Sequence, residues 1–239
     1  SCSEIGQVLE TKDHVTICVE SKERTWELMI YPVVGGFRMV AGKKGFFDGK
    51  PEAFSMEESE HAYIIRSKEH EMILQKETLE ISIDRKAITN LKNISFIFEK
   101  ESVSASRIQF SIHENSAIYG FGERFDSVNQ YGKTVALWQR DACEGCLASI
   151  GNQAYKNIPL VHTSDGFSFF ANTSYRMRMD GGDAVQDYLS VEALGDVFDF
   201  YIWSGTPREA MTAYGTLTGL PIFPPEWVFE PWAGGGGGR

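Results

Sequence analysis

Several separate segments of the sequence alternate apolar and polar residues at every second position. Between residues 79 and 84, Leu, Ile and Ile alternate with Glu, Ser and Asp, and the same period recurs at residues 108–112. Successive side chains of a strand point to opposite faces, so this period predicts strands that are buried on one face. Short apolar segments at residues 15–19, 26–31 and 37–40 continue the strand pattern. Because such faces need a second sheet to cover them, the sequence predicts an all-β sandwich.

One short helix is expected near the C-terminal end, because helical periodicity is not sustained before residue 206. Thr206 can cap this helix, Pro207 suits its first position, and Glu209 completes a capping box. Gly219 marks its end. Four apolar residues share one helical face: Ala210, Ala213, Tyr214 and Leu217.

Prolines after this helix mark the only domain boundary that the sequence indicates. Leu220-Pro221 and Pro224-Pro225 cannot continue a helix and favour extended backbone. The apolar residues 227–232 are then expected to form a strand that has no partner in the preceding sandwich. We therefore expect residues 1–222 to form one β-sandwich domain, and residues 223–239 to form a linker and the first strand of a second domain.

The composition argues against several functional classes. The chain has 239 residues, 42% of them hydrophobic, and its net charge of -10 and pI near 5.0 disfavour nucleic acid as a partner. No apolar run approaches the length that crosses a membrane, and the cytoplasm is the simplest compartment. The glycines at 234–238 lack the Gly-Lys-Ser/Thr ending of a phosphate loop. An aromatic content of 13% suits both a sheet core and the stacking of sugars on exposed rings.

The cysteines and histidines predict no metal site and no cofactor. Cys143 and Cys146 have Cys-x-x-Cys spacing, but a zinc ribbon needs a second pair and a redox motif is expected beside a βαβ pattern. We interpret them as reduced thiols in a loop. The five histidines have no ligand spacing such as His-x-x-x-His.

The second half of the chain carries a series of motifs in a fixed order. They are Tyr119-Gly120-Phe121-Gly122-Glu123-Arg124-Phe125, Trp138-Gln139-Arg140-Asp141, Gln153-Ala154-Tyr155-Lys156-Asn157-Ile158-Pro159, Phe198-Asp199-Phe200-Tyr201 and Gly205-Thr206-Pro207, before the exit at residues 217–227. In this order and spacing, residues 117–232 resemble the N-terminal domain of glycoside hydrolase family 31. Among its members the bacterial α-xylosidases are the most similar.

The resemblance implies a galactose-mutarotase-like β-sandwich with one short C-terminal helix, followed by the start of a (β/α)8 barrel. Members are retaining α-glycosidases, α-xylosidases and α-glucosidases among them, in which two aspartates of the barrel cleave the glycosidic bond. The nucleophile lies in a Trp-x-Asp-Met-Asn-Glu type of segment, which this sequence lacks. We therefore expect the N-terminal part of such an enzyme, with no catalytic residue and no turnover of its own.

In this family a long loop of the N-terminal domain leans over the barrel mouth and touches the sugar. The matching residues are Arg140 and Asp141, so the resemblance implies that they bind substrate. A carboxylate accepts hydrogen bonds from sugar hydroxyls, and a neighbouring guanidinium can hold the loop or donate to the substrate. Gln139 departs from the Asn that relatives usually have. The implied partners are an α-linked oligosaccharide or glycoside, the catalytic barrel and, because bacterial members often assemble, further copies of the chain.

Two other motif segments have structural interpretations. Gly120 and Gly122 lie between aromatic residues, a pattern that marks bulges or close backbone approach more often than a ligand loop. The apolar run after residues 155–159 indicates entry into a strand, and we interpret this segment as an interface with the barrel.

Two further functions stay open. The first is a stand-alone carbohydrate-binding or structural sandwich, which would bind sugar weakly without turnover. The second is an aldose-epimerase-like enzyme on a similar sandwich, which needs a histidine and a carboxylate that exchange protons with a sugar ring. The sequence does not reveal such a pair.

Overall fold

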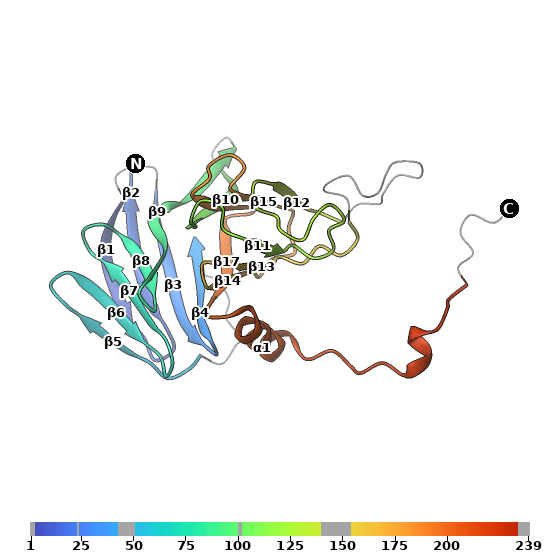
Figure 1. The fold of residues 1–239 in the computed structure, drawn as a ribbon. Helices are drawn as coiled ribbons and strands as arrows, with labels where there is room; N and C mark the ends of the chain where they lie inside the picture. Colours follow the sequence, from blue (N-terminus) through green and yellow to red (C-terminus); the bar gives the residue numbers. More distant parts are fainter. Residues whose placement is uncertain (1–2, 23, 43–50, 100–101, 140–153, 234–239) are drawn as a thin grey trace.

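The computed structural model describes residues 3–22, 24–42, 51–99, 102–139 and 154–233. Within these ranges the chain forms two antiparallel sheets that face each other, followed by one α-helix and one 3-10 helix (Figure 1). The predicted all-β sandwich with one short helix is therefore confirmed.

The strands of the first described sheet follow the order β1-β2-β3-β4-β17-β14-β13-β11. Their bounds are Ser3–Glu10 (β1), Val15–Ser21 (β2), Thr25–Val33 (β3), Gly36–Gly42 (β4), Ile118–Gly120 (β11), Leu160–Thr163 (β13), Phe167–Ala171 (β14) and Val197–Ser204 (β17). The second has the order β12-β15-β16-β10-β9-β8-β7-β6-β5. Its strands are Ser55–Glu58 (β5), Ala62–Arg66 (β6), Glu71–Gln75 (β7), Glu80–Ile83 (β8), Lys86–Glu99 (β9), Ser102–Ser111 (β10), Thr134–Leu137 (β12), Met177–Gly181 (β15) and Tyr188–Leu194 (β16).

The core between the sheets is built from residues that the period-two pattern predicts. Ile81 and Ile83 of β8 are fully buried, and so are Ile108 and Phe110 of β10. Phe110 reaches the opposite sheet, where its ring centroid lies 4.7 Å from that of Phe169 on β14. Aromatic pairs of this kind add about 0.5–1.5 kcal/mol to the effect of burial. The contact is one of several aromatic pairs that join the two sheets in the core.

The helix α1 spans Pro207–Thr218 and begins as the sequence predicts. The Thr206 hydroxyl accepts the N–H of Glu209 at 3.3 Å, and the Glu209 carboxylate accepts the N–H of Thr206 at 2.7 Å. The capping box is therefore confirmed. Gly219 follows the last turn with a φ of +90°, and its N–H donates to the carbonyl of Gly215 at 2.9 Å.

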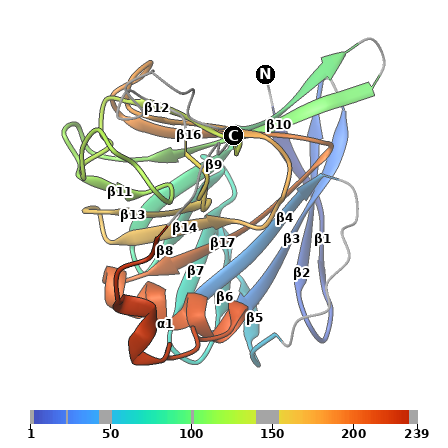
Figure 2. The same cartoon turned by 90° about the vertical axis from the view of Figure 1, so that its right-hand side faces the viewer.

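The α1 helix covers part of the outer face of the first sheet (Figures 1 and 2). Ala210 and Ala213 are buried against Trp203 of β17. Tyr214 packs edge-on against Phe170 of β14, with ring centroids 5.1 Å apart. Leu217 belongs to the same predicted face, but it is exposed. The helix thus shields the middle strands of this sheet from water.

A buried ion pair crosses the junction between β4 and β17. Arg38 Nε and Nη2 donate to the two carboxylate oxygens of Asp199 at 2.8 and 2.5 Å, and the two side chains are 5% and 17% exposed. The guanidinium lies 5.9 Å from the ring centroid of Tyr31 and 5.5 Å from that of Tyr201. Burial lowers the pKa of Arg38, but the hydrogen bonds and charge of Asp199 outweigh it and raise that pKa above its usual value. The pair joins residues that are 161 positions apart.

Asp199→Asn is expected to lower the free energy of unfolding by about 3 kcal/mol, because it leaves the buried Arg38 without its counter-ion. Replacing both partners by apolar residues, Arg38→Met with Asp199→Leu, should cost less than that single change. Glu192→Gln is the matched control, because the Arg107–Glu192 pair is more exposed and should contribute less than about 1 kcal/mol. Urea unfolding measures all three, and equal losses for Asp199→Asn and Glu192→Gln would contradict the prediction.

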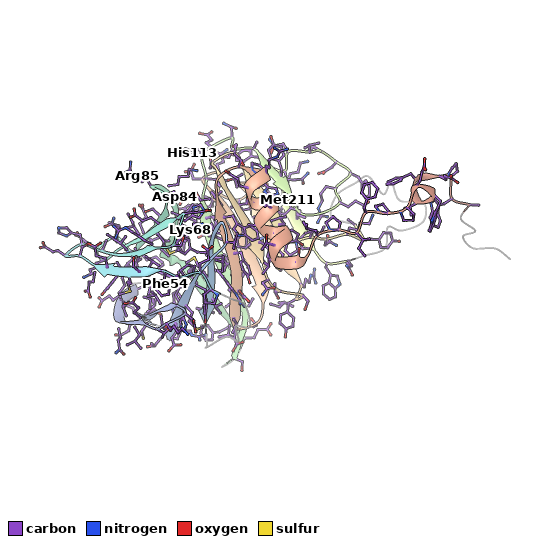
Figure 3. All side chains as sticks on the ribbon, turned by 90° about the horizontal axis from the view of Figure 1, so that it is seen from below. Phe54, Lys68, Asp84, Arg85, His113 and Met211 are labelled. Atoms are coloured by element: carbon purple, nitrogen blue, oxygen red, sulfur yellow. The ribbon has the colours of Figure 1, made fainter. Side chains whose placement is uncertain are left out.

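The turn between β8 and β9 has two residues with positive φ, a backbone conformation that glycine adopts more readily than other residues. Ile83 pairs with Lys86, and the two residues between them, Asp84 and Arg85, have φ values of +49° and +67°. Two positive values are typical of a type I′ turn, which matches the twist of the strands. The Asp84 carboxylate lies 2.8 Å from His70 Nδ1, whereas Arg85 is exposed and lies farther out (Figure 3).

Arg85→Gly is expected to raise the free energy of unfolding by about 0.5–1 kcal/mol, because glycine adopts a positive φ without the clash of a Cβ. Arg85→Ala removes the same charge but keeps the Cβ, and it should not stabilise the fold. Thermal unfolding of both variants measures the difference. An equal gain in the two variants would assign the effect to charge and not to the backbone.

The segment after α1 differs from its prediction. Residues 227–232 are predicted to form a strand, but Glu226–Phe229 form a 3-10 helix (η1) and residues 230–233 have no regular structure. The prediction of a strand is wrong for this described segment. A strand needs a neighbour for its backbone hydrogen bonds, and η1 lies away from both sheets (Figure 1). Local contacts form instead, and the rings of Trp227 and Trp232 pack with centroids 5.5 Å apart.

Candidate functional site

The sequence motifs converge at one end of the sandwich. Residues 119–125 begin in β11, residues 138–139 follow β12, and residues 154–159 lead into β13. These three strands lie at the same end of the molecule, on the side toward which the chain leaves α1 (Figures 1 and 2). Residues that are distant in the sequence therefore share one surface.

The glycines of the first motif permit close backbone contact. Gly120 has a φ of +122°, and a Cβ at this position would collide with the carbonyl oxygen of Leu160 on β13. Gly122 has a φ of +81°, and a Cβ there would collide with the carbonyl oxygen of Lys156. Larger residues would push the first and third motifs apart. The interpretation of these glycines as points of close backbone approach is confirmed.

Arg124 connects the first motif to the third. Its Nη2 donates to the carbonyl oxygen of Phe121 at 2.9 Å and to Oδ1 of Asn157 at 2.7 Å. Asn157 Nδ2 in turn donates to the carbonyl oxygen of Ala154 at 2.9 Å. Arg124 Nε and Nη1 are buried and have no hydrogen-bond partner among the described residues. Burial lowers the pKa of Arg124 below its usual value, against the opposing charge of Asp126.

Asp126 holds the loop between β11 and β12. Its Oδ1 accepts the N–H of Ser127 at 2.7 Å and Nε2 of Gln130 at 3.1 Å, and its Oδ2 accepts Nζ of Lys133 at 2.7 Å. The hydrogen bond from Lys133 contributes most to lowering the pKa of Asp126 from 3.8 to about 2. The loop is therefore tied to the ionised form of this carboxylate.

The stabilising effect of Asp126 should disappear in acid. Its pKa is lower in the folded chain, so its contribution is complete above the unfolded value near 4 and is lost as the pH falls toward 2. Asp126→Asn should therefore cost about 1–2 kcal/mol at pH 6, after allowance for solvent screening, and almost nothing near pH 2. Urea unfolding between these pH values measures the difference. Asp187→Asn, at an exposed carboxylate, is the control, and a cost of Asp126→Asn that is independent of pH would refute the assignment.

A cleft of about 410 Å³ opens beside these motifs. It is lined by Trp138 and Gln139 after β12, by Asn157 before β13, and by the turn between β14 and β15. Trp138 and Tyr175, the latter from this turn, are 53% and 64% exposed. Leu137 and Met177 also line the cleft, and both are buried, so the base is apolar. The cleft therefore combines exposed aromatic rings with amide and hydroxyl groups.

The residues predicted to bind substrate, Arg140 and Asp141, lie outside the described residues, and their role stays a prediction. The residue before them in the sequence, Gln139, lines the cleft. Cys143 and Cys146 are also outside the described ranges. Cys18, on β2, is a free and half-buried thiol.

Two hydrogen-bonded histidine–carboxylate pairs appear among the described residues, and the sequence analysis missed both. His113 Nδ1 lies 2.7 Å from Asp165 Oδ1, and His70 Nδ1 lies 2.8 Å from Asp84 Oδ2. The partners are 52 and 14 positions apart, so only the fold brings them together. Neither pair lines the cleft, and Asp165 follows the end of β13 that is farther from it. Both pairs belong to turns, where they hold local backbone, and this placement gives no support to an epimerase site.

No group of three or more His, Cys, Asp or Glu side chains in the described ranges could hold a metal ion. Among the helices of the described chain, none has the length and apolar character required to cross a membrane.

Solved structures share the fold of this chain. The cycloalternan-forming enzyme from Listeria monocytogenes matches 95% of this chain with 23% of its own, with a TM-score of 0.82 at 18% identity. A dextranase from Flavobacterium johnsoniae matches 94% of this chain with 29% of its own, with a TM-score of 0.79 at 20% identity. At such identities the likeness shows the fold alone, a sandwich of two antiparallel sheets.

The family follows from the sequence comparison. The family model of the glycosyl hydrolase 31 N-terminal galactose mutarotase-like domain matches residues 17–180, and the chain belongs to this family. The α-xylosidase XylQ of Lactiplantibacillus pentosus is 34% identical over 131 residues, which are 54% of this chain and 16% of the relative. Alpha-glucosidase 2 of Bacillus thermoamyloliquefaciens is 24% identical over 182 residues, which are 73% of this chain and 22% of the relative. The chain thus spans less than a quarter of the length of these two relatives.

Proposed function

We propose that this chain is the N-terminal part of a retaining α-glycosidase, an α-xylosidase or α-glucosidase, whose catalytic aspartates lie in a (β/α)8 barrel. Residues 1–222 form the N-terminal domain, and residues 223–239 lead into the barrel. Arg140 and Asp141 contact the sugar, and the chain alone has no turnover. The observation that carries the proposal is the family match over residues 17–180, because this family is the N-terminal domain of glycosyl hydrolases.

The position of the cleft supports a sugar contact at this end of the sandwich. Gln139 lines the cleft, and Arg140 and Asp141 follow it directly in the sequence. The relatives named above are an α-xylosidase and an α-glucosidase. The Listeria enzyme is known in complex with a pentasaccharide substrate, and the Flavobacterium dextranase in complex with isomaltotriose.

Exposed apolar side chains support a covering domain. Leu220, Ile222 and Phe223 are almost fully exposed, and Tyr155 and Ile158, next to the cleft residue Asn157, are also exposed. Large apolar side chains exposed close together in the sequence often mark interaction sites in proteins. The barrel that the family carries would cover them.

The test begins with the coding sequence after Arg239, which should continue into a barrel with a Trp-x-Asp-Met-Asn-Glu type of segment. In the protein that contains this barrel, Asp141→Ala should lower kcat/KM on α-xylosides or α-glucosides about 10- to 100-fold, because it removes charge-assisted hydrogen bonds to the sugar. Glu80→Ala, at an exposed carboxylate of β8, is the control.

Unchanged kinetics in the Asp141→Ala variant would refute the contact of this loop with the sugar. A stop codon directly after Arg239 would instead favour the stand-alone carbohydrate-binding or structural sandwich. In that case sugar binding without turnover is the expected activity.

A further inference from the structure

We propose that the cleft between Trp138 and Tyr175 is a binding site for one pyranose residue of an oligosaccharide. This inference rests on the proposed function, because it takes the ligand to be a sugar chain of the kind that such glycosidases cleave. It goes further in assigning described residues outside the pair Arg140 and Asp141 to the contact.

The aromatic residues of the cleft present ring surface to solvent. Trp138 and Tyr175 are more than half exposed, whereas Trp26 and Trp203 are almost fully buried in the sandwich. Burial of a large apolar side chain stabilises a protein by on the order of 1.5–3 kcal/mol, and a ring exposed to water does not contribute this free energy. The apolar C–H faces of a pyranose can cover such rings, while the hydroxyl groups stay at the edge.

The cleft is largely formed before a ligand arrives. The N–H of Tyr175 donates to Oγ1 of Thr173 at 3.1 Å, which fixes the turn that carries the ring. One edge of the ring lies over Gly195, where an added Cβ would be 3.8 Å from Cδ2 and Cε2 of Tyr175. The amide of Asn157 is oriented by Arg124 and by the carbonyl of Ala154. Pre-formed sites of this kind lose little entropy on binding.

The polar groups of the cleft suit hydroxyl groups. Asn157 Nδ2 uses one of its two hydrogens on Ala154, and no other described residue accepts the second, which can serve a ligand. Gln139 and Ser174 add an exposed amide and a hydroxyl to the same lining. These groups can both donate and accept, as a sugar hydroxyl does.

The size of the cleft suits a small ligand. No Asp, Glu, Lys or Arg is among the described residues that line it, in a chain with a net charge of -10. The volume of about 410 Å³ lies in the lower part of the range of about 300–1,000 Å³ that is typical of small-molecule sites. Space for one pyranose residue follows, with the rest of the chain leaving through the open side.

The test titrates the 239-residue chain with isomaltotriose and with xylose, followed by NMR on the indole N–H signals of the tryptophans. Saturable binding is expected with a Kd on the order of millimolar, as for a single small residue in an open site. Tyr175→Ala and Trp138→Ala should each weaken binding at least about tenfold, whereas Tyr175→Phe keeps the ring and should change it less than about threefold. Tyr119→Ala, at an exposed aromatic that does not line the cleft, is the matched control.

Thermal unfolding shows that each variant is folded before it is compared. Absence of saturable binding up to about 50 times the expected Kd would overturn the proposal, and so would equal affinities for Tyr175→Ala and the unchanged chain. If Asp141→Ala impairs turnover while Tyr175→Ala leaves sugar binding intact, only the cleft assignment fails. If Tyr175→Ala abolishes binding while Asp141→Ala has no effect on turnover, the cleft remains a sugar site and the proposed role of the loop fails.

Discussion

The junction between β4 and β17 is the constraint on which the rest of the fold depends. It joins a strand of the first fifty residues to the last strand of the sandwich, and the Arg38–Asp199 pair crosses it. The pair is held between the rings of Tyr31 and Tyr201, and Asn172 donates a further hydrogen bond to Asp199 at 2.8 Å. A buried ion pair is costly unless both partners are present and satisfied, so it favours this register of the two strands over a shifted one.

The cleft depends on this junction because its walls come from both sheets. Trp138 follows β12 of the second sheet, and Asn157 precedes β13 of the first. Tyr175 lies in the connection that passes from β14 of one sheet to β15 of the other. In the first sheet β17 lies between β4 and the pair β14 and β13. In the second sheet β15 and β16 lie between β12 and β10. The distance between the walls therefore depends on the packing of the sheets as well as on the three connections.

The sequence predicted those features that depend on nearby residues. The alternation around Ile81 and Ile108 reports burial of one strand face, and the Thr206–Glu209 capping box is complete within four residues. The sequence analysis missed the features that depend on residues far apart in the chain. Nothing near Arg38 indicates a carboxylate 161 positions away, and a cleft made by three separate connections has no local pattern. The strand expected at residues 227–232 was wrong for the same reason, since a strand depends on a neighbour.

Arg124 links the first and third motifs into one unit, although two of its donor atoms are unsatisfied among the described residues. A guanidinium whose Nε and Nη1 are buried and unpaired among the described residues lowers the stability of the fold. The hydrogen bonds of its Nη2 offset part of this cost. Its Nη2 links the carbonyl of Phe121 to the side chain of Asn157, and the collision that Gly122 avoids keeps the two segments in contact. Loss of Arg124 would leave the Asn157 amide held only by its hydrogen bond to the carbonyl of Ala154 among the described residues. Arg124 thus acts on the cleft through the Asn157 amide, which it orients together with the carbonyl of Ala154.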